Sequence, residues 1–424
     1  MKNMLLVVGF LLIISAILMP PVKFQSADTV VYADSGRAED IQRAVNEVIA
    51  AGGGIVFIPE GEFYWDASSF HQTFSGRPCG VVSEGGVSIF GMGADKTILK
   101  IVERAPDNAI MFGIDGSNGR PFTIFGIKFK GYVVDETEGL CAIRILDGKD
   151  FRICHCKFED FDNAAISTRK FRADCIHRGV IDHNVFDNPY KWGSPPLGGF
   201  IWGYGIIVTA YHGISDIWKP LTEMLGKYED NVVYIEDNIF NYTRHAIASN
   251  ERGYYVARYN HFKMTNYGSI DVHGNAGDGV GGRGVEAYGN VFEAVNEPRT
   301  IAFQIRGGGG VIFNNTIISH YEGIVLQKEP GSLEWAQVKQ LYIWDNTMTD
   351  VTKPFNNEGD YVEGEDYFMR PPSIDLDGFE YVPYPYPHPL VSGEEVTEYK
   401  WPKFVESAEQ NNTELISKRF PHVV

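Results

Sequence analysis

The chain has 424 residues, of which 44% are hydrophobic, so it is long enough to bury a large core. It carries 55 acidic residues against 37 Lys and Arg, a formal net charge of −18 at pH 7. This balance argues against a nucleic-acid partner, because no basic excess is present to neutralise phosphates. An anionic ligand would need a local cluster of Arg, Lys or His.

The first 27 residues have the pattern of a secretory signal. Lys2 precedes an apolar run from Met4 to Met19, and small residues close the segment at Ser26-Ala27. The apolar run is short for a membrane span. We expect residues 1–27 to be a signal peptide and the protein to be secreted or at the cell surface, without stable membrane insertion. An uncleaved anchor is the alternative.

Residues 38–51 are predicted to form a helix. Ile41, Val45 and Val48 recur at helical spacing, and Gly52 is placed to end the helix. A glycine turn, a buried strand and a Pro-Glu-Gly turn follow in AGGGIVFIPEGEFYW.

This segment resembles a known superfamily. A helix, then AAGGGIVFIPEGEF, then a strand with the turn GMGADKTIL is similar to the first coil of the pectin-lyase-like superfamily. The resemblance, over about residues 29–100, implies a right-handed parallel β-helix capped by the helix. Such folds host lyases, hydrolases, epimerases and non-enzymes, so the resemblance implies a fold and leaves the chemistry open.

The rest of the chain repeats with the period of a β-helix coil. Apolar residues recur every 22 to 31 residues, with one interval of 54 residues that holds either two coils or one coil and an insertion. They are Phe129, Phe158, Phe186, Phe240, Phe262, Phe292, Ile317 and Met348. An Asn stands two residues before most of them, at Asn184, Asn238, Asn260, Asn290, Asn315 and Asn346. These predict a hydrogen-bonded Asn ladder at one corner of every coil.

We therefore predict an all-β fold, a single-stranded right-handed parallel β-helix with an N-terminal capping α-helix. The β-helix is placed at residues 28–350, with the cap at 38–51 and a loop insertion at 189–230. The Pro/Tyr-rich residues 351–424 are expected to pack on the solenoid as a C-terminal tail.

The insertion is rich in aromatic residues and is a candidate binding platform. Trp202 and Tyr211 would stack against sugar rings, with His212 beside them. The alternative is that the aromatic residues form the loop's own small core.

A cluster of polar residues in successive second strands is the candidate catalytic site. When the second strand of each coil is aligned from its Phe position, six isoleucines are predicted to stack and point inward: Ile166, Ile207, Ile247, Ile270, Ile301 and Ile324. Alternation then points Asp271 and His273 outward, beside Ala248 on one coil and residues 302–304 on the other. Ala246 and Ala248 would leave a hollow there. The predicted catalytic residues are Arg244, His245, Asp271, His273 and Arg306, and the predicted substrate-binding residues are Trp202, Tyr211, His212, Arg283 and Gln304.

This set fits the cleavage of a uronate-containing glycan by β-elimination. Arg pairs with a carboxylate and neutralises it, which acidifies the C5 proton, and His273 or His245 would remove that proton. In several lyases of the superfamily an Arg or Lys is the base, as the resemblance implies. The alternative is a solvated surface or a structural ladder of ion pairs.

Several family motifs are missing. There is no Arg-x-Pro-x-x-Arg run, and the polygalacturonase Asp set is absent, which weakens a hydrolase. VIDHNVF resembles a pectate-lyase segment, but Asp182 and His183 also fit the Asn repeat, so we interpret them as structural. No cofactor is required; calcium is an option that would need clustered carboxylates, for which Asp271, Asp278 and Glu286 are weak candidates.

The five cysteines do not describe a disulfide framework, and we interpret most of them as small buried hydrophobes. They are Cys79, Cys141, Cys154, Cys156 and Cys175. Cys154 and Cys156 are two apart in a strand-like run, which predicts that their side chains face the same way and that His155 faces the other. That geometry opposes a metal site made by these three residues, and no metal ligands are assigned.

The sequence thus favours an exported polysaccharide lyase whose partner is an acidic glycan. A glycoside hydrolase or epimerase acting in the same groove is one alternative, and a non-catalytic surface β-helix protein is the other. Convergence of the five catalytic candidates would favour an enzyme, and scatter would favour the non-catalytic protein.

Overall fold

The computed structural model describes residues 29–132, 139–188, 203–210, 219–265 and 267–392. The expected signal peptide lies outside these residues. Within the described part of the chain, no helix is both long enough and apolar enough to cross a membrane.

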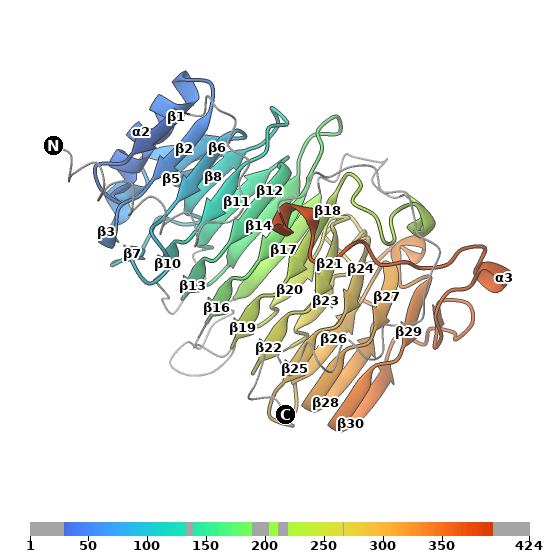
Figure 1. Ribbon diagram of the computed structural model, residues 1–424. Helices are drawn as coiled ribbons and strands as arrows, with labels where there is room; N and C mark the ends of the chain where they lie inside the picture. The colour runs from blue at the N-terminus through green and yellow to red at the C-terminus, as the bar shows by residue number, and fades with distance from the viewer. Residues whose placement is uncertain (1–28, 133–138, 189–202, 211–218, 266, 393–424) are drawn as a thin grey trace.

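The chain forms the right-handed parallel β-helix that the sequence predicts, capped at its N-terminal end by helix α2 (Ala38–Ala50) (Figure 1). Ile41, Val45 and Val48 are fully buried and face the first coil. Gly52 follows with φ 88°, a left-handed conformation that suits glycine after a helix. The helix therefore closes the open end of the core, where an uncovered coil would expose apolar side chains.

One sheet, sheet A, holds one strand from each coil, and its strands pair in parallel. Its strands are β1 (Thr29–Tyr32), β2 (Gly54–Phe57), β6 (Val87–Phe90), β9 (Thr123–Phe125), β12 (Lys149–Cys154), β15 (Arg178–Asp182), β18 (Val232–Glu236), β21 (Tyr254–Arg258), β24 (Gly284–Tyr288), β27 (Gly309–Phe313), β29 (Leu341–Trp344) and β31 (Tyr367–Phe368).

The second sheet, sheet B, contains two columns of parallel strands that merge in the last coils. The first column is β3 (Gly61–Trp65), β7 (Thr97–Ile101), β10 (Lys128–Lys130), β13 (Lys157–Glu159), β16 (Val185–Asp187), β19 (Ile239–Asn241), β22 (His261–Lys263) and β25 (Val291–Glu293). The second is β5 (Arg77–Glu84), β8 (Ile110–Asp115), β11 (Cys141–Leu146), β14 (Ala164–Lys170), β17 (Tyr204–Ala210), β20 (Ile247–Ser249), β23 (Ile270–Val272) and β26 (Ile301–Ile305). Strands β28 (Thr316–Leu326) and β30 (Thr347–Asn357) run through both columns, and β4 (Gln72–Phe74) pairs antiparallel with β5.

Short helical turns complete the described elements. They are η1 (Ala67–Ser69), η3 (Leu221–Glu223), η4 (Glu334–Ala336), α3 (Ile374–Asp377) and α4 (Pro389–Ser392). The coils extend beyond residue 350, where the sequence placed their end, because β30 spans that position and β31 still pairs with β29.

The predicted column of apolar residues is a continuous stack, formed by aromatic rings up to Phe292 and by Ile317 and the partly buried Met348 beyond it. Each member pairs with the next in register, from Phe129 with Phe158 to Ile317 with Met348. Phe186 pairs directly with Phe240, so the interval of 54 residues is one coil with an insertion. Their rings stack with centroids 4.6 Å apart.

The predicted Asn ladder is present at the corner between sheet A and the first column of sheet B. Asn238 Nδ2 donates to Asn260 Oδ1 at 3.1 Å, and the Asn238 backbone N–H donates to the same oxygen at 3.0 Å. The same pair of bonds joins Asn260 to Asn290. Because each amide also bonds the backbone of the preceding coil, the ladder fixes the distance between coils.

The inward stack of the second column differs from the prediction at two positions. Ile206, rather than Ile207, pairs with Ile247, and Phe303, rather than Ile301, pairs with Ile270. Ile207 consequently points outward.

The Pro/Tyr-rich segment crosses back over the outer face of sheet A (Figure 1). Its backbone carbonyls at Tyr384 and Pro385 accept hydrogen bonds from Arg258 at 2.6 and 2.8 Å. Tyr381 Oη donates to Glu286 at 2.6 Å, and the backbone N–H of His388 donates to Glu236 at 2.9 Å. Sheet A is therefore covered along these coils.

Candidate functional site

Three of the five predicted catalytic residues converge on the outer face of sheet B. Asp271 is in β23, His273 follows the end of that strand, and Arg306 follows β26 on the next coil. Arg306 binds both oxygens of Asp271, at 2.9 and 2.8 Å from Nη2, and Nε adds a bond of 3.1 Å. His273 Nε2 lies 2.9 Å from Asp271 Oδ2. Alternation along β23 places Asp271 and His273 on the same face, as the sequence predicts.

Glu329, which sequence reasoning missed, completes the cluster. Its Oε2 lies 3.2 Å from Arg306 Nη1 and 3.7 Å from His273 Nδ1. The backbone N–H of Gly274 donates to the same oxygen at 2.8 Å. Glu329 lies in the turn after β28, so strand periodicity could not place it; the only available signal was an acidic turn one coil beyond Arg306.

Burial and opposite charges determine the ionisation of the cluster. Burial alone would raise the pKa of Asp271, but Arg306 and His273 hold it well below its usual range. Burial opposes a charge on His273, and so does Arg306, whose Nη2 lies 2.7 Å from Nδ1; Asp271 outweighs both and raises the pKa of His273. Glu329 also has a lowered pKa, because His273 and Arg306 outweigh its burial. The cluster thus holds two carboxylates, a guanidinium and an imidazole that readily accepts a proton.

His245 lies next to the cluster as a neutral imidazole. Burial lowers the pKa of His245 to about 3. Its Nδ1 is 2.8 Å from the carbonyl oxygen of Gly268, so Nδ1 carries the proton and Nε2 is the basic nitrogen. Its ring stacks on Tyr204 with centroids 5.4 Å apart and meets the His273 ring edge to face at 5.9 Å.

Arg244 forms the border of the site on the side of Tyr204. Its guanidinium carbon lies 5.9 Å from the ring centroids of both Tyr204 and Tyr267. Burial lowers the pKa of Arg244. All five catalytic candidates therefore belong to one neighbourhood, with Asp271, His273 and Arg306 in direct contact.

The predicted substrate-binding residues are divided. Gln304 pairs in register with Asp271 and belongs to the site; its Nε2 donates to Gln327 at 2.7 Å. Arg283 does not join it, because its buried guanidinium donates to the Lys219 carbonyl at 3.0 and 2.6 Å. Trp202, Tyr211 and His212 lie outside the described residues.

The hollow expected beside Asp271 is filled. Ala246 faces the core, and Ala248 packs against Tyr204 and Ala164 on the outer face. The accessible part of the site is on the side of His273, Arg306 and Glu329, whose side chains are 11%, 15% and 22% exposed.

Two metal hypotheses can be tested against the geometry. Donor atoms of His245, Asp271 and His273 lie within 4.8 Å of one another. Arg306 Nη2 lies among these donors, 2.9 and 2.8 Å from the two oxygens of Asp271 and 2.7 and 3.0 Å from the two ring nitrogens of His273, so the guanidinium occupies the place that a cation would take. The three carboxylates considered for calcium do not come together. Asp278 pairs with Arg252, and Glu286 binds Tyr254 and Tyr381, beneath the C-terminal segment that crosses sheet A.

The cluster predicts a pH-dependent contribution of His273 to stability. Because its pKa is raised on folding, this contribution is complete below about pH 6.5 and is lost as the pH rises through the folded pKa. His273→Gln should therefore cost most stability in mild acid and progressively less in alkali, as measured by urea unfolding of both proteins at several pH values. The exposed His71→Gln is the control, and a cost for His273→Gln that does not vary with pH would contradict the assignment.

Comparisons with known proteins found similarity among solved structures only. No family model matches it, and no curated protein matches it. Among solved structures it is similar to the A-module of an Azotobacter vinelandii mannuronan C-5 epimerase, with 13% identity, 79% of this chain and 96% of that chain covered, and a TM-score of 0.41. A mannuronic acid specific polysaccharide family 6 lyase from human gut microbiota is 13% identical, with 79% of this chain and 78% of that chain covered and a TM-score of 0.41.

Two further structures are similar at the same level. The α-1,3-glucanase of Streptomyces thermodiastaticus gives 12% identity, 85% and 73% coverage and a TM-score of 0.44. The tailspike of E. coli bacteriophage HK620, solved with a pentasaccharide, is 12% identical and has a TM-score of 0.46. The match covers 74% of this chain and 53% of the tailspike chain. These are likenesses at 12–13% identity, and the parallel β-helix itself is established by the chain's own strand pairing.

Proposed function

We propose that this protein is a polysaccharide lyase that cleaves an acidic, uronate-containing glycan by β-elimination on the outer face of sheet B. The observation that carries the proposal is the convergence of Asp271, His273 and Arg306 with Glu329 and two flanking residues, His245 and Arg244. A rod with a purely structural surface does not require a proton-transferring imidazole bonded to a buried carboxylate.

Each step of the elimination has a candidate group. Asp271 accepts a hydrogen bond from His273 Nε2 and orients the ring, which makes Nδ1 the nitrogen that takes the proton from C5. The electron pair forms the C4–C5 double bond, the C4–O bond breaks, and the leaving oxygen takes up a proton from the imidazolium that His273 has become or from water. Arg306 and Arg244 supply the positive charge that the uronate carboxylate needs. Arg306 contacts Nδ1, and its move toward the substrate carboxylate would uncover that nitrogen.

A second group of arginines extends the site along the same face. Arg144 in β11 belongs to the same row of outward residues as Asp271, through Ser167, Ile207 and Ala248. Four coil steps of about 4.8 Å separate the two, roughly 19 Å, which is a span for several linked sugars. The described residues contain no carboxylate paired with Arg144, whose Nε is buried without a hydrogen bond, and Arg77 adds charge beside it. An anionic ligand would balance this charge.

Arg144→Met is expected to raise KM for a long polyuronate by about 10- to 100-fold, the value of a hydrogen bond to a charged group. The kcat should change little, because Arg144 is far from the reacting atoms. Steady-state kinetics on long and short substrates tests this, with the exposed Arg43→Ala as the control. An unchanged KM on long chains would remove Arg144 from the binding path.

The proposal is tested by mixing the purified protein with a panel of polyuronates and following absorbance near about 235 nm, where the unsaturated product absorbs. A rise establishes the lyase. New reducing ends without absorbance would indicate a hydrolase, and altered uronate composition in uncut chains would indicate an epimerase. Binding without any of the three would support the non-catalytic protein.

A further inference from the structure

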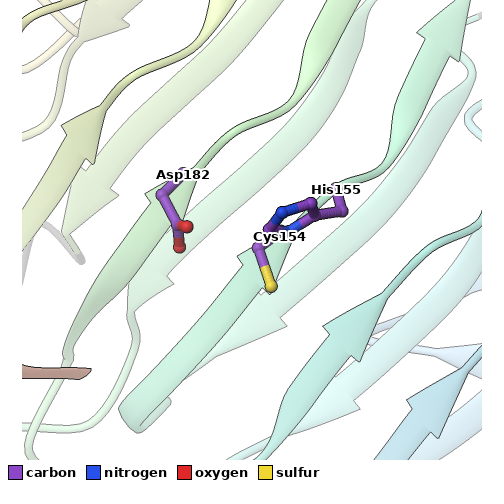
Figure 2. A group of neighbouring side chains, drawn as sticks. All are labelled: Cys154, His155 and Asp182. Carbon is purple, nitrogen blue, oxygen red and sulfur yellow. The ribbon is translucent and has the colours of Figure 1, made fainter. Parts of the chain in front are cut away.

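A second cluster of donor side chains lies on a different part of the molecule, at the corner where strands β12 and β15 of sheet A end. Figure 2 shows Cys154 and His155 at the end of one strand and Asp182 at the end of the neighbouring one. One donor atom from each residue, a sulfur, a ring nitrogen and a carboxylate oxygen, lies within 4.8 Å of the others. We propose that these three residues bind a divalent transition-metal ion, with zinc as the best match.

The corner geometry brings the three side chains together. His155 has φ 56°, a left-handed conformation, so the alternation of an extended strand ends at Cys154. The prediction that Cys154 and Cys156 face the same way is therefore wrong. Cys156 packs in the central core, whereas Cys154 packs outside it with Phe90 and Phe125. The turn brings the imidazole of His155 alongside Cys154 and not onto the opposite face.

The donor set selects the class of ion. Thiolate, imidazole and carboxylate are the ligands of zinc and related borderline metals, whereas calcium and magnesium take oxygen only. Donors around a tetrahedral zinc lie about 3.3–3.8 Å apart, given its usual bond lengths. The three donor atoms lie within 4.8 Å of one another, so small side-chain rotations would bring them to these distances. Three protein ligands leave a fourth position for water or an external ligand.

The surroundings hold the ligands in place and leave a path for the ion. Arg152 donates hydrogen bonds of 2.8 Å to Asp182 Oδ1 and 2.7 Å to Asp182 Oδ2. His183 Nδ1 lies 2.8 Å from Oδ2. Oδ1 thus keeps a lone pair for a metal. The His155 ring stacks on that of His183, with centroids 5.2 Å apart and planes 1° from parallel. Cys154 and Asp182 are buried but His155 is exposed, so an ion enters beside the imidazole.

A metal at this corner would join two successive coils. It lies on sheet A, and the cluster of Asp271, His273 and Arg306 lies on the outer face of sheet B. Its presence is therefore independent of the proposed lyase activity. The nearest partners of the ligands, Arg152 and His183, form hydrogen bonds to Asp182 of the kind that orient metal ligands.

Cobalt(II) titration of the metal-free full-length protein tests the proposal, because a cobalt–thiolate bond gives a charge-transfer band in the near ultraviolet. We expect this band with visible bands of a low-coordinate site, and their loss on adding zinc. Cys154→Ser should abolish the charge-transfer band, and His155→Ala should weaken cobalt binding by about tenfold or more. Cys79→Ser and Cys141→Ser, which change other buried thiols, should leave the spectrum unchanged.

The absence of a band at millimolar cobalt, or a band that survives Cys154→Ser, would overturn the site. If Cys154→Ser does not fold, the comparison of His155→Ala with wild type decides, because His155 is an exposed side chain. Zinc should also raise the thermal midpoint of the wild type and not that of His155→Ala. No glycan is present in these experiments, so their failure leaves the proposed lyase untouched.

Discussion

Replacement of His273 by alanine is expected to lower the rate of product formation on a polyuronate by about 10²- to 10⁴-fold, the usual contribution of a positioned general base. His273 is the one imidazole of the cluster that is both bonded to Asp271, at 2.9 Å, and partly exposed to a ligand. Its raised pKa makes it a better proton acceptor than His245, whose pKa is about 3. The loss should fall on kcat, since alanine removes the group that takes the proton. The measurement is the absorbance assay for the unsaturated product.

Two companion variants separate catalysis from folding. Asp271→Asn keeps the shape of the site but removes the charge that orients His273 and raises its pKa, so it should lower activity and shift the pH profile toward acid. His71→Ala changes an exposed histidine away from the site and should leave activity intact. Full activity in a folded His273→Ala protein would exclude His273 as the base. It would favour an arginine as the group that removes the proton.

The sequence predicts the coils well because their cause repeats. A buried Phe and a bonded Asn serve the same purpose at the same corner of every coil, so their spacing is visible without a structure. Asp271 and His273 are predictable for a related reason: in a strand, residues two apart share a face. The placement of Phe303 instead of Ile301 was not predictable, because the turn before β26 is longer than its counterpart before β23.

Features that depend on turns were the ones missed. Glu329 reaches Arg306 from the turn after β28, and no periodicity reports on a turn. The same is true of His155, where one left-handed residue reverses the expected direction of a side chain. The sequence predicts that the C-terminal segment packs on the solenoid but not which sheet it covers, because the groups that hold it come from coils far away in the sequence.

Those groups lead to the largest expected effect on stability. Arg258→Ala should lower the free energy of unfolding by about 3–5 kcal/mol, because it leaves a buried carboxylate unpaired. Arg258 and Glu236 are both 0% exposed and lie 2.6 Å apart. Arg258 also binds the carbonyls of Tyr384 and Pro385, and its guanidinium lies 4.8 Å from the Tyr234 ring centroid. Urea unfolding measures the loss, and limited proteolysis should show early cleavage within residues 379–392.

A double variant distinguishes the unpaired charge from the lost contacts. In Glu236→Gln with Arg258→Met, the glutamine oxygen still accepts from the His388 N–H, and no charge is left buried, so most of the stability should return. If the double variant is as unstable as Arg258→Ala, the bonds to the covering segment carry the effect instead. Arg43→Ala, which breaks an exposed pair with Asp34, should cost less than about 1 kcal/mol. A similarly small cost for Arg258→Ala would mean that the segment is not held by this pair.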